Sequence, residues 1–428
     1  MNQGGGDVSV PPGLHLTRRS LLIGAGGAAV SPAAAARRGK SSKGPRVVVI
    51  GAGVFGAWTA HHLLKRGANV TLVDAFGPAN SKASSGGEAR VTRAAYGKDE
   101  IYTRMAADSL PQWQALSTVS GLPILIAAGV LFFFPNEQEY LTQSVAAHKA
   151  MGLPSELLDQ REMQRRFPMI DFTGAALGLF EPGFGALMAR RSVQTLVDRF
   201  VRDGGSYRQG LVEMLPAGAA ADGRLDAIRL SDGETIGGDQ FVFALGPWLP
   251  KLFPDVIGEK ILPTRQEVFF FAPPAGDRSF EAGPMPVWAD FNNGDFFYGF
   301  PDLEARGVKF AHDEHGVKVD PDTQDRRPTA AALAEVVAYR DRRLPRLKGA
   351  TLTEARVCQY ENSSNGDFII DFHPTMSNVL LVGGGSGHGF KHGPEVGRYA
   401  VDQLFGTAAS EPRFSLASKS AVHRREVH

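Results

Sequence analysis

The segment Arg46-Val-Val-Val-Ile50-Gly51-Ala-Gly53-Val-Phe-Gly56 decides the fold. Residues 47–50 form an apolar, β-branched run, which is typical of a parallel strand buried on both faces. Three glycines with the spacing Gly-x-Gly-x-x-Gly follow this run directly. A strand that ends at such a glycine turn predicts the first turn of a dinucleotide-binding sheet.

The residues after the glycine turn complete the same unit. Residues 57–66 have the apolar spacing of a helix, and Gly67 is suited to terminating it. Residues 69–73 form a second apolar strand, which Asp74 closes. The succession of strand, glycine turn, helix and strand predicts the first half of a Rossmann-like sheet.

Each residue of this motif has an expected role. Gly51 makes the tight turn, Gly53 lets the backbone approach a pyrophosphate, and Gly56 lets the helix pack closely against the strand. Asp74 stands where a carboxylate can accept hydrogen bonds from ribose hydroxyls. The motif by itself does not distinguish a flavin from a nicotinamide dinucleotide.

Later segments predict elements of two kinds. Buried strands at 240–244 and 379–382 and a helix at 193–204 are expected to extend the nucleotide-binding part. Aromatic strands at 266–271 and 295–300 are expected to be exposed on one face and to form an antiparallel sheet over a pocket. A further helix is expected at 330–343.

The expected fold is therefore α/β (α+β overall), with a discontinuous Rossmann-like nucleotide-binding domain and an inserted antiparallel-sheet substrate domain. The predicted segments are residues 1–40 as an export signal and linker, 45–120, 190–263 and 352–410 as the nucleotide-binding domain, 121–189 and 264–351 as the substrate domain, and 411–428 as a C-terminal tail.

Composition narrows the class of ligand. The 428 residues suit one large or two intertwined domains, and a net charge of +1 argues against nucleic acid or an anionic membrane as the main partner. The 50 glycines cluster in particular turns, which indicates close approach of the backbone to a ligand. Cys358 is the only cysteine, so no intramolecular disulfide can form. We assign no metal ligands.

The N-terminus has the pattern of a targeting segment. Thr17-Arg18-Arg19-Ser20-Leu21-Leu22 places paired arginines before a mild apolar stretch, and Ala34-Ala35-Ala36 offers a small-residue cleavage site. The apolar stretch is shorter than the ~20 residues of a membrane-spanning helix. The segment predicts twin-arginine export to the periplasm or the extracellular space, with a disordered basic tail as the alternative.

Two other segments contain candidate ligand-binding groups. Arg90 and Arg93 can point to one side of a loop, where they either form a solvated basic face or bind flavin and a substrate carboxylate. Residues 383–391, Gly-Gly-Gly-Ser-Gly-His-Gly-Phe-Lys, follow a predicted buried strand and precede a predicted helix. Glycine at this density indicates backbone pressed against a planar ligand, although a structural loop is the alternative.

The single cysteine lies in the same region of the chain. A lone cysteine is ordinarily a small buried hydrophobe. Cys358, however, stands just ahead of a predicted strand, close in sequence to the glycine-rich loop. A thiolate there could form a thioether with the methyl substituent of an electron-poor flavin ring.

These motifs resemble the family of monomeric sarcosine oxidase and N-methyltryptophan oxidase, within the FAD-dependent amine and amino-acid oxidases. The resemblance extends over nearly the whole chain after about Pro45. Its most specific stretches are residues 73–76, 90–97, 298–301, Lys309, 319–323, 357–358, 368–374 and 386–391.

The resemblance implies roles for particular residues. It implies that Cys358 binds FAD covalently through the 8α position and that Lys309, through a water, meets flavin N5 and activates O2. It implies that Arg93 and Lys391 clamp the substrate carboxylate, that Arg90 lies over the flavin ring, and that Tyr298 is an active-site tyrosine. The expected FAD-binding residues are Gly51, Gly53, Gly56, Asp74, Ala75, Arg90, Val212, Cys358, Gly385, Gly387, His388, Gly389 and Lys391.

The sequence departs from the family pattern at two places. Sarcosine oxidases have a histidine four residues after the catalytic lysine, whereas this chain has Asp313 there and His312 one residue earlier. On a strand, that shift turns His312 to the opposite face, so either a bulge restores it or an acid occupies the pocket. The family's histidine before the first arginine is also replaced, because Gly86 and Gly87 stand in that stretch.

The expected activity is oxidation of the C–N bond of a small amine that bears a carboxylate, a secondary, N-methyl or cyclic amine. The expected electron acceptor is O2, and the products are an imine or aldehyde and H2O2. We expect a monomer without an integral membrane span. The alternatives are a dehydrogenase that passes electrons to a quinone or carrier protein, and a non-catalytic flavin-binding module.

Overall fold

The structure is a computed structural model, and it describes residues 44–215, 222–292, 295–314 and 316–423. The strands are β1 (Arg46–Ile50), β2 (Asn69–Asp74), β3 (Ala89–Thr92), β4 (Leu125–Ile126), β5 (Val130–Phe134), β6 (Glu156–Asp159), β7 (Leu177–Glu181), β8 (Gly185–Met188), β9 (Ser206–Gln209), β10 (Ala227–Arg229), β11 (Thr235–Gly237), β12 (Gln240–Phe243), β13 (Ile261–Phe271), β14 (Val287–Asn292), β15 (Asp295–Phe300), β16 (Val308–His312), β17 (Leu352–Ser363), β18 (Ile369–His373) and β19 (Met376–Gly383). The helices are α1 (Val54–Lys65), α2 (Glu100–Val119), α3 (Glu139–Met151), α4 (Gln160–Arg166), α5 (Ala189–Arg202), α6 (Leu249–Leu252), α7 (Ala330–Arg343) and α8 (Gly393–Leu404).

A six-stranded sheet contains the predicted βαβ unit. Its strand order is β18-β19-β12-β1-β2-β9, and all neighbours are parallel except β18 and β19. Side chains alternate along β1, so Val47 and Val49 enter one core while Val48 and Ile50 enter another on the opposite face. Burial on both faces explains the uninterrupted apolar run and confirms the predicted buried strand.

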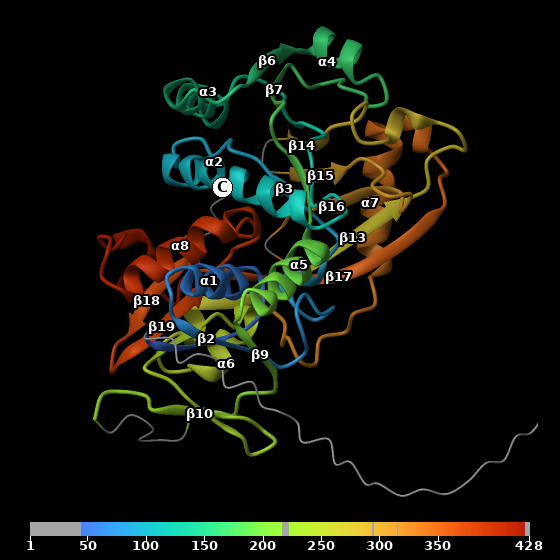
Figure 1. Ribbon diagram of the computed structural model, residues 1–428. Helices are drawn as coiled ribbons and strands as arrows, with labels where there is room; N and C mark the ends of the chain where they lie inside the picture. The colour runs from blue at the N-terminus through green and yellow to red at the C-terminus, as the bar shows by residue number, and fades with distance from the viewer. Residues whose placement is uncertain (1–43, 216–221, 293–294, 315, 424–428) are drawn as a thin grey trace, which may run out of the picture. The chain divides into compact units, whose positions relative to one another are not determined.

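Helices cover one face of this sheet. In Figure 1, α1, α5 and α8 lie together on the side of β2 and β19 that faces α2, whereas β10 lies on the other side. Trp58 of α1 packs edge-on against Trp113 of α2, with ring centroids 5.2 Å apart. These contacts fix the N-terminal end of α1, where the glycine turn lies.

A second, eight-stranded sheet has the order β17-β13-β16-β15-β14-β5-β7-β6. It is antiparallel except between β14 and β5, so it confirms the predicted antiparallel sheet with one parallel pair added. A small three-stranded sheet, β3-β8-β4, contains Arg90.

The prediction that the aromatic strands are exposed on one face is wrong for β13. Phe269 and Phe271 pack with α7 residues such as Val336 and Tyr339 in one core, and Phe270 packs with Val268 on the opposite face. The consecutive phenylalanines are buried because α7 covers one face of the strand, while on the other face Phe270 packs with Val268 and lies under the Arg306 guanidinium.

One predicted boundary also differs from the strand pairing. The predicted nucleotide-binding domain includes residues 352–363. In the structure these residues form β17, which pairs with β13 from Ile261↔Ser363 to Phe271↔Leu352. The eight-stranded sheet therefore includes β17 and the start of β13, and the chain returns to the six-stranded sheet only at β18.

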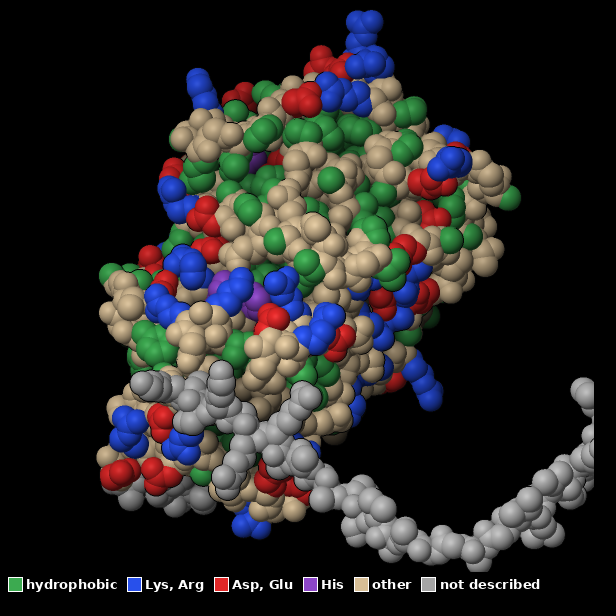
Figure 2. Space-filling model, viewed as in Figure 1, with side chains coloured by type: hydrophobic (Ala, Val, Ile, Leu, Met, Phe, Trp, Pro, Cys, Tyr) green, Lys and Arg blue, Asp and Glu red, His purple; other side chains and the backbone are tan. Residues whose placement is uncertain are grey.

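The remaining sequence expectations concern the termini and the surface. The predicted export signal lies outside the described residues. Within the described ranges, no helix combines the length and apolar character needed to cross a membrane. On the face shown in Figure 2, Lys and Arg side chains are interspersed with Asp and Glu rather than gathered into a patch of one sign.

Candidate active site

The carboxyl ends of β1 and β12 border a cavity of about 1380 Å³. This is the point where the sheet order diverges, with β2 on one side of β1 and β12 on the other, and open α/β sheets bind ligands there. The cavity is lined by five residues predicted to bind the cofactor: Gly51, Gly53, Asp74, Ala75 and Val212.

The three glycines of the turn have the geometry that the motif requires. Gly51 has φ +105°, and a Cβ there would lie 2.2 Å from the carbonyl oxygen of Ala244. A Cβ at Gly56 would lie 1.8 Å from the carbonyl oxygen of Gly51, so this glycine permits helix packing behind the turn. A Cβ at Gly53 would meet only Ser85 Oγ at 3.5 Å, because this residue faces the cavity.

Backbone donors hold the Asp74 carboxylate at the cavity wall. Its Oδ2 accepts from Ala52 N at 2.8 Å, and its Oδ1 accepts from Phe76 N at 2.9 Å and Gly77 N at 2.8 Å. Burial raises the pKa of Asp74, while the three N–H donors lower it. The side chain is thus fixed in orientation before any ligand binds.

A second cavity of about 1180 Å³ lies beside the eight-stranded sheet. Segments that are distant in sequence meet there, namely β3, β15, β17 and the glycine-rich loop after β19. Seven predicted site residues line it: Arg90, Arg93, Tyr298, Cys358, Gly387, His388 and Lys391.

A smaller cavity of about 420 Å³ connects the two large ones. It shares Glu361 with the nucleotide cavity, and it shares Gly387 and Arg90 with the second cavity. Gly385 and Gly389 also line it. Gly387 has φ +78°, and a Cβ there would lie 2.8 Å from the Tyr360 ring, so a larger residue would be strained and would push against that ring.

The two predicted clamp residues, Arg93 and Lys391, are buried cations that line the same cavity. Arg93 is 6% exposed and Lys391 is 2% exposed. Burial holds the pKa of Lys391 well below its ordinary value, and the charge of Arg93 lowers it further. A bound carboxylate would offset that repulsion, so the pair favours an anionic ligand.

Their neighbours keep the two cations in place. Lys391 Nζ donates to the carbonyl oxygen of His388 at 2.7 Å, and the Arg93 guanidinium lies 4.0 Å from the centre of the Tyr96 ring and donates to the carbonyl oxygen of Ala95. Burial lowers the pKa of Arg93, but Tyr140, Tyr96, Glu181 and Asp313 together outweigh burial and raise it above its ordinary value.

Lys309 lines a different cavity from the clamp. It borders a space of about 420 Å³ together with Arg90 and Cys358, and both of these also line the clamp cavity. Its Nζ donates to the carbonyl oxygen of Ala89 at 3.1 Å. Burial, reinforced by the charge of Arg90, lowers the pKa of Lys309 to about 7. Arg90 and Cys358 therefore stand between the two lysines.

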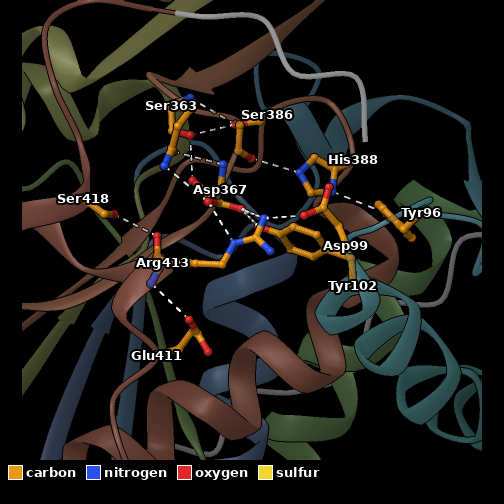
Figure 3. Close-up of polar contacts among 12 residues, drawn as sticks. Tyr96, Asp99, Tyr102, Ser363, Asp367, Ser386, His388, Glu411, Arg413 and Ser418 are labelled. Carbon is orange, nitrogen blue, oxygen red and sulfur yellow. Dashed lines mark hydrogen bonds and ion pairs between the residues drawn. The ribbon is translucent and has the colours of Figure 1, made fainter. Parts of the chain in front are cut away.

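A buried network of hydrogen bonds holds the ring of His388. Tyr96 Oη lies 2.7 Å from His392 Nε2 and 3.4 Å from His388 Nδ1, and His388 Nε2 lies 3.0 Å from the carbonyl oxygen of Gly366. Figure 3 shows Tyr96 and His388 beside a second cluster, in which Tyr102 Oη donates to Asp367 at 2.7 Å and Arg413 donates to the same carboxylate at 2.7 Å.

The C-terminal segment belongs to this second cluster. Arg413 also pairs with Asp99 at 2.9 Å, and Leu416 N donates to Asp371 at 2.8 Å. The residues predicted to be a tail, as far as they are described, thus pack against the loop that positions His388 (Figure 3).

Asp313, not His312, faces the clamp cavity. Tyr360 Oη donates to Asp313 Oδ1 at 2.9 Å, and Asp313 N donates to the carbonyl oxygen of Phe296 at 2.8 Å. His312 points to the opposite face, where it pairs with Asp295 at 2.9 Å and Glu335 at 3.2 Å. Of the two alternatives left by the sequence, the acid in the pocket is confirmed.

The structure adds residues that the sequence had not singled out. Tyr360 lies two residues after Cys358 on β17, so strand periodicity could have placed both on one face. Glu361 is buried, and its Oε2 has no hydrogen-bond partner among the described residues. Burial raises the pKa of Glu361 to about 7.

The aromatic strands expected over a pocket form only part of its wall. Phe296 and Tyr298 line the clamp cavity, whereas Phe269 and Phe271 lie in the core under α7. In the described ranges, no group of three or more His, Cys, Asp and Glu side chains is arranged to hold a metal ion.

Comparison with known proteins agrees with this arrangement. A family model described as FAD dependent oxidoreductase matches residues 46–403. The chain is 30% identical over 384 residues to a monomeric sarcosine oxidase of Bacillus sp. (strain B-0618), covering 87% of this chain and 95% of the relative. It is 29% identical over 368 residues to an N-methyl-L-tryptophan oxidase of Salmonella heidelberg (strain SL476), covering 85% and 95%.

Solved structures share the fold at lower sequence identity. L-proline dehydrogenase from P. horikoshii is 20% identical with a TM-score of 0.75, covering 87% of this chain and 97% of that one. Fructosyl peptide oxidase from E. terrenum is 20% identical with a TM-score of 0.74, covering 88% and 93%.

Proposed function

The chain belongs to the FAD-dependent oxidoreductase family, and from that membership we propose that it oxidises the C–N bond of a small secondary amine bearing a carboxylate, with O2 as the electron acceptor. One observation supports the substrate class above all. Arg93 and Lys391 are two buried cations that line one cavity together with Tyr298 and Cys358. An anionic ligand would favour the charged form of Lys391, whose pKa burial and the charge of Arg93 hold well below its ordinary value.

The residues present fit FAD. The nucleotide cavity offers the glycine turn at the N-terminus of α1 to phosphates and the Asp74 carboxylate to ribose hydroxyls. Glycine backbone lines the connecting cavity, where the unpartnered Oε2 of Glu361 can meet a hydroxyl group. The clamp cavity, with Cys358 and Gly387 in its wall, adjoins the connecting cavity and is where the ring and the substrate would lie.

The chain's own residues bind and orient the substrate. Arg93 and Lys391 take the carboxylate as a charge-assisted pair, which fixes one end of the molecule. The aromatic walls Phe296 and Tyr298 confine the remainder, so the C–H bond beside nitrogen is held in one position. When bound, FAD supplies the redox chemistry by accepting a hydride equivalent from that bond.

Lys309 supports O2 as the acceptor. It is separated from the clamp by Arg90 and Cys358, so a cation is available on the side away from the substrate. With its pKa lowered to about 7 by burial, Lys309 can hold a proton and stabilise negative charge that develops on reacting oxygen. The expected products are an imine, which water hydrolyses to an aldehyde or keto compound, and H2O2.

We also propose covalent attachment of FAD through Cys358. Its sulfur lines both the clamp cavity and the Lys309 cavity, so it lies beside the space that the ring would fill. Denaturing the purified yellow protein tests this directly, because a thioether keeps the colour with the polypeptide. Complete release of colour would contradict attachment while leaving FAD dependence intact.

Export by a twin-arginine signal and a monomeric state complete the proposal. The first is tested by replacing Arg18 and Arg19 with lysines and comparing the protein in cytoplasmic and exported fractions. The second is tested by light scattering of the purified protein.

The central experiment is anaerobic mixing of flavin-loaded protein with N-methyl amino acids, cyclic imino acids and primary amino acids. Bleaching of the flavin by a secondary amine with a carboxylate, followed by one H2O2 per turnover when O2 is admitted, is the expected result. Bleaching without peroxide on reoxidation would indicate a dehydrogenase. No bleaching by any member of the panel would overturn the enzymatic proposal.

A further inference from the structure

The end of β16 places an acid at the opening of the clamp cavity. Side chains alternate along this strand, so Lys309 and Asp313 lie on the face that borders the cavities while His312 lies on the other. Four residues of extended chain separate Lys309 from Asp313 by roughly 13 Å. Lys309 is 3% exposed, whereas Asp313 is half-buried and the adjoining Glu314 is exposed.

The Asp313 carboxylate is held in this position by groups on two other strands. Tyr360 Oη on β17 donates to its Oδ1 at 2.9 Å, and the carbonyl oxygen of Phe296 on β15 accepts from its backbone N at 2.8 Å. Tyr298 lines the same cavity as Tyr360. The carboxylate is therefore a fixed part of the cavity wall.

Aromatic side chains share the cavity wall with this carboxylate. Phe296, Tyr298 and Tyr360 all line the cavity together with Asp313. Ring faces attract cations, and a carboxylate among aromatic rings gives both a charge partner and a weakly polar enclosure for one. A neutral apolar side chain would instead desolvate the carboxylate and offer it neither a charge nor a hydrogen bond in return.

The cavity is thus positive at its inner end and negative at its opening. Arg93 and Lys391 are the inner charges, and Asp313 is near enough to help raise the pKa of Arg93. A ligand whose only charge is a carboxylate complements Arg93 and Lys391 but carries no charge complementary to Asp313.

We propose that the substrate is an amino acid with a second cationic group, an ammonium or guanidinium on its side chain, and that Asp313 is the residue that selects it. This rests on the proposed function, because it assumes that the substrate carboxylate occupies Arg93 and Lys391. The side chain then extends toward the opening, where Asp313 pairs with its cation and the rings of Phe296 and Tyr298 cover it.

A matched pair of substrates tests the proposal in the flavin-loaded protein. Nα-methyl-L-lysine and Nα-methyl-L-norleucine share the reacting amine and the carboxylate and differ in the terminal ammonium. We expect kcat/KM for the lysine compound to exceed that for the norleucine compound by about 10- to 100-fold, the range of a charge-assisted contact at a partly desolvated site.

Two substitutions assign the preference to Asp313. Asp313→Asn keeps the shape and removes the charge, and it should bring the ratio of kcat/KM for the lysine compound to that for the norleucine compound down to about one. Asp313→Glu, which keeps the charge, should restore part of the preference. The control is Glu335→Gln, which removes a negative charge on the opposite face of β16, where Glu335 pairs with His312, and should leave the preference intact.

The possible outcomes separate the two proposals. Equal or better oxidation of the norleucine compound by the unaltered protein, or a preference that survives Asp313→Asn, would overturn the role of Asp313 and leave the amine oxidase function standing. A clear preference for an amino acid with a polyhydroxylated rather than a cationic side chain would also overturn it. Failure of both N-methyl compounds and of the wider amine panel to bleach the flavin would overturn the proposed function itself.

Discussion

Nη2 of Arg90 lies 3.4 Å from Sγ of Cys358, so the guanidinium donates to the only sulfhydryl of the chain. The same guanidinium is held by the carbonyl oxygens of Ala89 at 2.9 Å and Ser84 at 2.8 Å. Two backbone carbonyls thus hold the Arg90 guanidinium, and the guanidinium in turn holds the Cys358 sulfur between the clamp cavity and the Lys309 cavity.

Replacing Cys358 with serine should separate cofactor binding from cofactor attachment. The hydroxyl cannot form the proposed thioether, but the cavities remain, so Cys358→Ser should bind FAD reversibly. Acid precipitation should leave colour in the pellet of the unaltered protein and in the supernatant of the variant. Colour in both supernatants would contradict the role of Cys358.

Removing one clamp cation should weaken the reaction with carboxylate-bearing amines. Arg93→Met or Lys391→Met leaves the substrate carboxylate with one partner, and loss of a buried charged contact costs about 2–5 kcal/mol, or about 30- to 5000-fold in kcat/KM. Steady-state peroxide assays measure the effect, and flavin content checks the fold. An unchanged kcat/KM with full flavin content would place the carboxylate elsewhere.

The pH dependence of the oxygen step should follow Lys309. Because burial lowers its pKa to about 7, the ammonium predominates below pH 7 and the neutral amine above it. If the ammonium assists oxygen, the reoxidation rate of the reduced protein falls as pH rises through about 7. Stopped-flow mixing with O2 should show this decline, and Lys309→Met should be slower by about 10²- to 10³-fold and lack it. A variant as fast as the parent would refute the role.

The same lysine should also affect stability, with a definite sign. Its folded pKa of about 7 lies below the ordinary value of 10.5, so the unfolded chain binds the proton more tightly. Burial of the charged Lys309 therefore lowers the free energy of unfolding by its full amount below pH 7 and by almost nothing above about pH 10.5. Urea unfolding should find Lys309→Met more stable by up to about 4 kcal/mol at pH 6 and by little at pH 10. A gain that grows with pH would contradict this.

The C-terminal segment should contribute to the stability of the site. Arg413→Ala leaves the buried carboxylate of Asp367 without its ion pair, which should lower the free energy of unfolding by about 1–3 kcal/mol. Arg165→Ala is the control, because its pair with Glu162 is exposed and worth at most about 1 kcal/mol. Thermal unfolding measures both, and equal effects would show that Arg413 has no special role.

The parts of the fold that could be predicted depend on local sequence. The unit from β1 to β2 is recognisable because an apolar run, a glycine turn and a closing acid stand close together. The pairing of β17 with β13 has no such local signal, since strands far apart in sequence choose partners through packing of whole faces. That is why the predicted domain boundary does not follow this pairing.

Among the site residues, too, those in local motifs could be predicted and those placed by strand geometry could not. Arg93, Lys391 and Cys358 could be selected by motif and resemblance, and the structure brings them to one cavity. A bulge in β16 would have turned His312 toward that cavity, and a regular strand turns Asp313 toward it. The sequence cannot distinguish these two cases, whereas the regular pairing of Phe297 with His312 does. Glu361 was not singled out because a single acid among polar residues, here between Tyr360 and Asn362, forms no motif.

Strand β17 restricts the insertions and deletions that this protein can tolerate. Cys358, Tyr360 and Asn362 alternate along it toward the clamp cavity, and each is paired across to β13. Adding or deleting one residue upstream of Cys358 would turn the sulfur, the phenol and the amide away together. Enzymes diverging toward new amines, in nature or in the laboratory, are therefore expected to vary the end of β16 freely while β17 changes only by substitution.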